Sequence, residues 1–191
     1  MRHRVVIVLT SLAMLLALAP ARFAGAGGVS TALTVSKMSI KLNFAKPAQD
    51  SITMTGLLVG VLPTTPDYDP TGLAVSIDVG GVVRVFTLDA KGKSKINYDQ
   101  VVVKLVRKHG VAVGHQVTAK IARASLATDL ADEGLTDVTV TNEPRAVQVR
   151  VSTSGIPNAA QVQLLYKATQ GKSGKASNVK RRRGGGPGAR R

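Results

Sequence analysis

The sequence predicts an all-β protein, a β-sandwich of about eight short antiparallel strands. Polar and apolar residues alternate over 37–44, which is the period of a strand that buries one face. Turn-forming residues such as Asp69-Pro70-Thr71-Gly72 and Gly80-Gly81 separate the alternating runs. The other runs are 51–55, 73–79, 101–106, 117–121, 147–151 and 161–167. Short strands at this spacing are typical of sandwiches and barrels, and we expect the sandwich.

One segment departs from the alternation. Residues 122–130 are rich in Ala and Leu, and either Ser125 or Thr128 is able to cap a helix that ends at Gly134. The sequence therefore predicts one short helix near 122–133.

Internal repetition suggests two similar halves of four strands each. Residues 74–79 are followed by a glycine turn, an apolar strand and a Lys-Gly-Lys-Ser turn, and 146–151 begin a similar order that ends in Gly171-Lys172-Ser173. We predict a first half at 36–95 and a second at 96–170. Two ordinary hairpins would produce part of the same match, so a single unrepeated domain is the alternative.

The N-terminus predicts export. A basic start at 2–4 precedes an apolar run from Val5 to Ala19, and Ala24-Gly25-Ala26 has the small residues of a cleavage site. We assign 1–26 to a signal peptide cleaved near Ala26, and 27–35 to a linker. The apolar run of about 15 residues is shorter than the roughly 20 needed to span a bilayer. We therefore expect a secreted or periplasmic protein that is not integral to a membrane after cleavage.

The chain has no cysteine, which excludes disulfides, thiol nucleophiles and thiolate metal sites. The fold must rest on its own buried core. Only 3% of the residues are aromatic and there is no Trp, which disfavours a surface that stacks sugars or bases.

The formal net charge of +15 is concentrated at the C-terminus. Residues 27–166 carry 14 Lys and Arg against 11 acids, whereas 167–191 carry nine cations and no acid. Residues 171–191 consist mainly of Gly, Lys, Arg, Ser and Pro, so we predict a disordered basic tail.

That tail is the candidate binding segment for an anionic envelope polymer, lipid head groups or extracellular DNA, held by counterion release. A solvated end without a partner is the alternative. The candidate polyanion-binding residues are Lys180, Arg181, Arg182, Arg183, Arg190 and Arg191.

No motif predicts catalysis. After cleavage His109 and His115 are the remaining histidines, and we expect both at a solvated turn because two ligands are few for zinc. No Gly-x-Ser-x-Gly elbow and no phosphate-loop spacing occurs. We expect no catalytic residue, no cofactor and no metal, and a secreted hydrolase that uses one of these histidines is a third hypothesis.

The segment 67–72 imitates the start of a calcium loop, with Asp67, Asp69 and then Asp78 at the twelfth position. The alternation of 73–79 predicts a strand, which would carry Asp78 about 20 Å from the loop. We expect an ordinary turn here, and cation binding at Asp67 and Asp69 stays open. The acids at 129–137 fit a solvated helix face.

Together these features predict an exported, non-enzymatic structural or interaction protein of the cell envelope or exterior, with an unknown protein or envelope partner and no small-molecule substrate. The alternative is a polyanion-binding protein that acts through its basic tail.

Overall fold

A computed structural model describes residues 32–65 and 67–178. Within these ranges all regular secondary structure is β-strand, which confirms the all-β prediction. The ten strands are β1 (Leu33–Asn43), β2 (Asp50–Leu58), β3 (Ala74–Val79), β4 (Val82–Thr87), β5 (Lys93–Ile96), β6 (Asp99–Lys108), β7 (Val111–Ala124), β8 (Val140–Thr153), β9 (Ile156–Thr169) and β10 (Ser173–Asn178).

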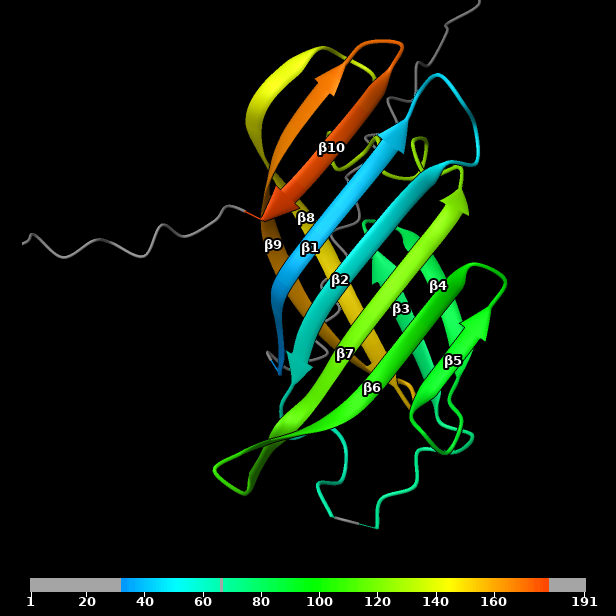
Figure 1. The fold of residues 1–191 in the computed structure, drawn as a ribbon. Helices are drawn as coiled ribbons and strands as arrows, with labels where there is room; N and C mark the ends of the chain where they lie inside the picture. The colour runs from blue at the N-terminus through cyan, green and yellow to red at the C-terminus, as the bar shows by residue number, and fades with distance from the viewer. Residues whose placement is uncertain (1–31, 66, 179–191) are drawn as a thin grey trace, which may run out of the picture.

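The strands form one antiparallel sheet in the order β4-β3-β8-β9-β10-β1-β2-β7-β6-β5. The sheet curls until its edge strands β4 and β5 approach each other, so that it is nearly closed into a barrel (Figure 1). At the turn between them the Asp89 amide donates to the Lys93 carbonyl at 2.8 Å. Across the opening, Arg84 Nε on β4 lies 2.9 Å from Asp99 Oδ2 at the start of β6. This ion pair joins the two ends of the sheet.

The predicted two-sheet sandwich is therefore wrong. A sheet that curls on itself buries one face of every strand, as two packed sheets do, so both architectures produce the same alternation. Two strands also lack a strong alternating signal. β5 has only four residues, and β10 consists of small and polar residues.

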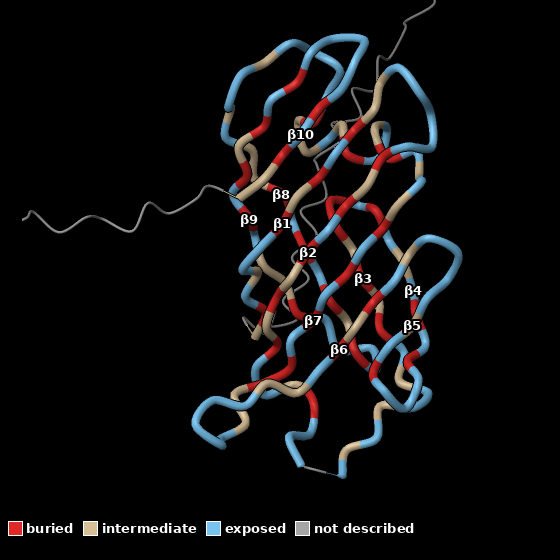
Figure 2. The backbone as a smooth tube through the Cα atoms, in the orientation of Figure 1, coloured by how far each residue is buried: buried red, intermediate tan, exposed pale blue. Residues whose placement is uncertain are grey.

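The core lies inside the curled sheet. Buried and exposed positions alternate along the strands, as Figure 2 shows. On β1 the inward residues Met38 and Ile40 pair in register with Met54 and Ile52 of β2, and all four side chains are buried. Burial of such side chains stabilises the fold by roughly 1.5–3 kcal/mol each.

The predicted helix near 122–133 is absent. Residues 122–124 end β7, and 125–134 form a series of turns in which the Leu130 amide donates to the Leu126 carbonyl at 3.0 Å. Leu126, Leu130 and Leu135 are almost completely buried. Their helix-like spacing arises because they cover one end of the core, and no helix forms.

Asp50 fixes this cover to the sheet. One carboxylate oxygen accepts the Leu126 amide and the other accepts the Asn43 amide, each at 2.7 Å. The other end of the core is covered by the connection from β2 to β3, where Leu62 is buried and Tyr68 is half-buried.

The prediction that 171–191 are disordered is wrong for 173–178. These residues form β10, which pairs with β9 on one side and β1 on the other. Its inward residues Gly174 and Ala176 are small and buried, so its sequence gives little hydrophobic signal. The predicted linker 27–35 also extends too far, because β1 begins at Leu33.

The signal peptide at 1–26 and the tail residues 179–191 lie outside the described residues. Strands from the two predicted halves alternate in the sheet, since β2 pairs with β7 and β3 with β8. The division at 95 and 96 stays a prediction. Within 32–65 and 67–178, no helix has the length and hydrophobicity to cross a bilayer.

Candidate functional site

Three lysines from three neighbouring strands meet in one row across the sheet. Lys175 on β10 is directly opposite Lys41 on β1 and directly opposite Lys167 on β9. All three side chains are exposed. Directly opposed residues in antiparallel strands have Cβ atoms about 4.5–5.5 Å apart. We call Lys41, Lys175 and Lys167 the lysine row.

The alternation of each strand places these lysines on the outer surface. On β10 the neighbours of Lys175 are Gly174 and Ala176, and both are buried. On β9 Lys167 lies between the buried residues Tyr166 and Ala168. Because successive side chains in a strand point to opposite faces, each lysine must point outward.

No acid on these strands neutralises the row. Over the neighbouring strands β9, β10, β1, β2 and β7, the acidic residue is Asp50. Asp50 is 3% exposed, and both its carboxylate oxygens accept backbone amides. We call the outer face of these five strands the basic wall. Its exposed lysines are Lys37, Lys41, Lys120, Lys167 and Lys175.

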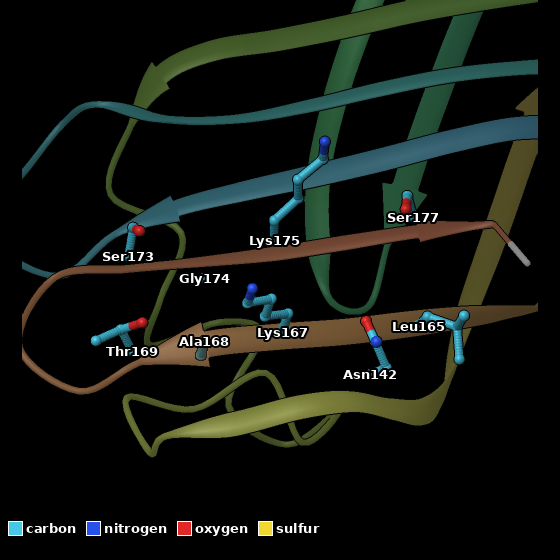
Figure 3. Close-up of a pocket in the computed structure, with 9 residues that line it drawn as sticks. All are labelled: Asn142, Leu165, Lys167, Ala168, Thr169, Ser173, Gly174, Lys175 and Ser177. Carbon is cyan, nitrogen blue, oxygen red and sulfur yellow. The ribbon is translucent and has the colours of Figure 1, made fainter.

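A shallow pocket of about 350 Å³ lies within the basic wall, between β9 and β10. Figure 3 shows Lys167 and Lys175 projecting from the two adjoining strands that line it. Asn142, Thr169, Ser173 and Ser177 add hydroxyl and amide groups to the lining, and Leu165, Ala168 and Gly174 supply its apolar part. The lining contains no aromatic side chain. Such a surface offers charge and hydrogen-bond donors to an anionic group, and it offers no ring for stacking.

Several acids of the described chain accept backbone amides in turns. Asp78 accepts the Gly81 amide at 3.0 Å, Asp89 accepts the Lys91 and Lys93 amides at 2.8 Å, and Asp137 accepts the Gly171 amide at 2.7 Å. Asp78 and Asp89 lie outside the five strands of the basic wall, whereas Asp137 binds the turn that joins β9 to β10 at one end of the wall.

The predicted polyanion-binding residues Lys180–Arg183, Arg190 and Arg191 lie outside the described residues. The described residues end at Asn178, the last residue of β10. β10 is also the strand that carries Lys175.

The two histidines occupy different environments, and the prediction that both lie at a solvated turn is wrong for one of them. His109 is exposed in the β6–β7 turn, with a φ of 51°. His115 is 3% exposed, and within the described residues its Nε2 atom has no hydrogen-bond partner. The Tyr68 ring packs edge-on against the imidazole, with ring centroids 5.8 Å apart. Burial lowers the pKa of His115 below its usual value, which favours the neutral imidazole.

The sequence pattern contained the signal for this burial. His115 has the same parity as Val117, Ala119 and Ile121, which point inward on β7. Extending the alternation by two residues would have placed the imidazole in the core.

The calcium-like segment forms a turn. Asp69 Oδ1 accepts both the amide and the hydroxyl of Thr71, at 2.9 and 2.5 Å. Asp78 lies on β3, one residue before its end. Among the described residues, no three His, Asp or Glu side chains gather where they could hold a metal ion.

Comparison with known proteins finds no match among family models, curated proteins or solved structures. The function must be inferred from the geometry.

Proposed function

We propose that the mature chain is an exported, non-enzymatic interaction protein that binds an anionic polymer along the basic wall. The observation that carries this proposal is the lysine row. Three ammonium groups stand at directly opposed positions of adjoining strands, with no acid beside them on those strands.

The lysine row destabilises the folded state. Like charges directly opposed on one sheet face destabilise the strand pair, and an acid in any one of these positions would relieve that cost. A destabilising arrangement that has no role in packing is expected at a binding surface. An anionic polymer would neutralise all three charges at once.

The chemistry of the basic wall favours a polymer that is recognised by its charge. Lysine ammonium groups act as point charges, and they bind phosphate or carboxylate without demanding a fixed orientation. The shallow pocket lacks an aromatic ring, so sugar and base stacking contribute nothing there. Binding of this kind proceeds through counterion release and weakens steeply with salt.

The test measures binding of the mature chain, 27–191, to long-chain inorganic polyphosphate at several salt concentrations. The wall variant combines Lys41→Gln, Lys167→Gln and Lys175→Gln. The control variant removes three exposed lysines on β5 and β6, at one end of the strand order, through Lys93→Gln, Lys95→Gln and Lys108→Gln.

The proposal predicts that the wall variant binds about 150-fold more weakly, if each of the three lysines contributes about 1 kcal/mol near an anionic surface. The slope of log K against log salt should become shallower by about two to three. The control variant should keep most of the affinity. Equal losses in both variants would show that only net charge matters and would refute a defined wall.

The basic tail acting alone is the second candidate, favoured by the cluster at 180–183. A chain that ends at Asn178 keeps β10 and the whole basic wall. If this truncation abolishes binding while the wall variant binds normally, the tail is the binding segment and the wall is not.

A further inference from the structure

We infer that the bound polyanion crosses β9, β10 and β1 along the lysine row, and that its anionic groups are phosphates within the polymer main chain. This inference rests on the proposed function of the basic wall. It goes further by giving the bound polymer a direction and a chemical class.

The first support is that the lysine row is a single line of charge. At the next outward-facing positions of the three strands, on either side of the row, the directly opposed residues are uncharged. They are Asn43, Ser173 and Thr169 on one side, and Ser39, Ser177 and Leu165 on the other. A polymer that followed one strand would meet one lysine of the row, whereas a polymer that crosses the strands meets all three.

The second support is the spacing of these positions. Neighbouring strands lie about 4.7–4.9 Å apart, so the lysine row spans about 10 Å across the sheet. The flanking residues lie about 7 Å from the lysines along each strand, because two residues of a strand rise about 3.3–3.4 Å each. A thin polymer that lies over the row thus has ammonium groups beneath it and neutral groups on both sides.

The third support is the chemistry of the flanking groups. Ser173 and Thr169 are exposed, and Ser39 and Ser177 are half-buried. Ser173, Ser177 and Thr169 line the shallow pocket together with two lysines of the row (Figure 3). A hydroxyl has no charge, so it adds affinity only where an acceptor oxygen of the ligand lies within hydrogen-bond distance. The flanking rows therefore favour a ligand with acceptor oxygens on both sides of its backbone.

A phosphate in a polymer main chain meets this requirement. Its unbridged oxygens project from the backbone to both sides, and such oxygens bind lysine together with serine and threonine hydroxyls in nucleic-acid complexes. Polyglutamate instead carries its charge at the end of a flexible side chain, so hydroxyls at fixed positions add less to its binding. The pocket has no aromatic ring that would stack a base. We therefore expect a base-free polymer such as polyphosphate or poly(glycerol phosphate).

The experiment measures the affinity of the mature chain for long-chain polyphosphate, poly(glycerol phosphate) and poly-L-glutamate with matched numbers of charges, at one salt concentration. The flank variant combines Ser39→Ala, Ser173→Ala and Ser177→Ala. The control variant changes three half-buried serines on strands outside the basic wall, through Ser76→Ala, Ser94→Ala and Ser152→Ala. Both variants keep every lysine, and urea unfolding confirms that each protein is folded.

The wild-type chain should bind phosphate polymer more tightly than polyglutamate. The flank variant should bind phosphate polymer about 10-fold or more weakly, because hydrogen bonds to charged oxygens are lost. Its affinity for polyglutamate should change by less than about threefold, and the control variant should bind every polymer as the wild type does. A loss confined to polyphosphate or to poly(glycerol phosphate) would identify which phosphate linkage the site fits.

Two results would overturn the inference while leaving the proposed function intact. One is an equal loss of affinity for the phosphate polymers and for polyglutamate in the flank variant, and the other is no loss for any polymer. In either case the variant with Lys41→Gln, Lys167→Gln and Lys175→Gln should still bind polyphosphate weakly. If the wild-type chain binds none of the polymers, the proposed function itself fails.

Discussion

At the residue scale, His115 is a polar group held in an apolar environment. Its Nε2 atom has no partner in the described part of the chain, and Tyr68 packs against the ring. Burial lowers its pKa in the folded state, whereas in the unfolded chain the imidazole titrates near 6.5. The folded state therefore disfavours the protonated form.

This difference predicts a loss of stability at acidic pH. The contribution of neutral His115 is fully present above pH 6.5 and declines as the pH falls below that value toward the lowered folded-state pKa. Urea unfolding midpoints between pH 8 and 5 measure it, with steps of about half a unit. His115→Gln should reduce this part of the pH dependence, and His109→Asn at the exposed turn should not. Identical profiles for all three proteins would contradict the prediction.

Gly174 is required by a close neighbour. A Cβ atom at this position would lie 2.5 Å from the Tyr166 hydroxyl oxygen, and that hydroxyl donates to the Thr136 carbonyl at 2.7 Å. Burial, with a smaller contribution from Asp137, raises the pKa of Tyr166 to about 12, so the phenol stays protonated and keeps its donor.

We expect Gly174→Ala to destabilise the fold by roughly 1–3 kcal/mol, the usual range for overpacking. Tyr166→Phe removes the hydroxyl, so the cost of Gly174→Ala should be smaller in that background. Urea unfolding of the two single variants and the double variant gives the coupling. Strict additivity would argue against the contact.

At the element scale, β10 connects the fold to the proposed function. Its inward side consists of Gly174 and Ala176, while its outward side carries the central lysine of the row. The strand is held by ladders on both sides and contributes little hydrophobic burial of its own.

Because Lys175 faces a lysine on each side, Lys175→Thr should stabilise the fold. The expected gain is roughly 0.2–1 kcal/mol, and it should shrink as added salt screens the repulsion. Lys95→Thr on β5 is the matched control, since its directly opposed residue is Gln100. A gain of equal size in the control would mean that threonine propensity explains it.

Truncation separates the strand from the tail. A chain ending at Asn178 should unfold at nearly the wild-type urea concentration, because it keeps every pairing of β10. A chain ending at Gln170 lacks β10 and leaves β9 and β1 without their shared neighbour, so it should lose cooperative unfolding. Cooperative unfolding of the shorter chain at the wild-type midpoint would contradict the central position of β10.

The strands with clear alternation could be predicted from the sequence. The runs at 37–44, 51–55, 73–79, 101–106, 117–121, 147–151 and 161–167 overlap β1, β2, β3, β6, β7, β8 and β9. β10 could not be predicted from the sequence, because pairing with two neighbouring strands fixes its conformation and its own residues give little hydrophobic signal. The curling of a single sheet could not be predicted either, since a two-sheet sandwich produces the same alternation of buried and exposed residues along each strand.

At the scale of the whole molecule, the lysine row could not be predicted from the sequence, because it depends on the register of three paired strands. Lys41 lies more than a hundred residues from Lys167 and Lys175 in the sequence. A count along the chain assigned the positive charge to the tail, whereas the folded sheet gathers lysines on one face. The central lysine of the row, Lys175, lies on β10, which is why a test of the basic wall must leave 173–178 in place.

The central claim is that an anionic polymer binds on the basic wall. Amide chemical shifts of the ¹⁵N-labelled mature chain during titration with long-chain polyphosphate test it most directly. We expect shift changes concentrated on β9, β10 and β1 around the lysine row, and their loss in the variant with Lys41→Gln, Lys167→Gln and Lys175→Gln. Changes centred on β5 and β6, or no changes in 32–178, would contradict it.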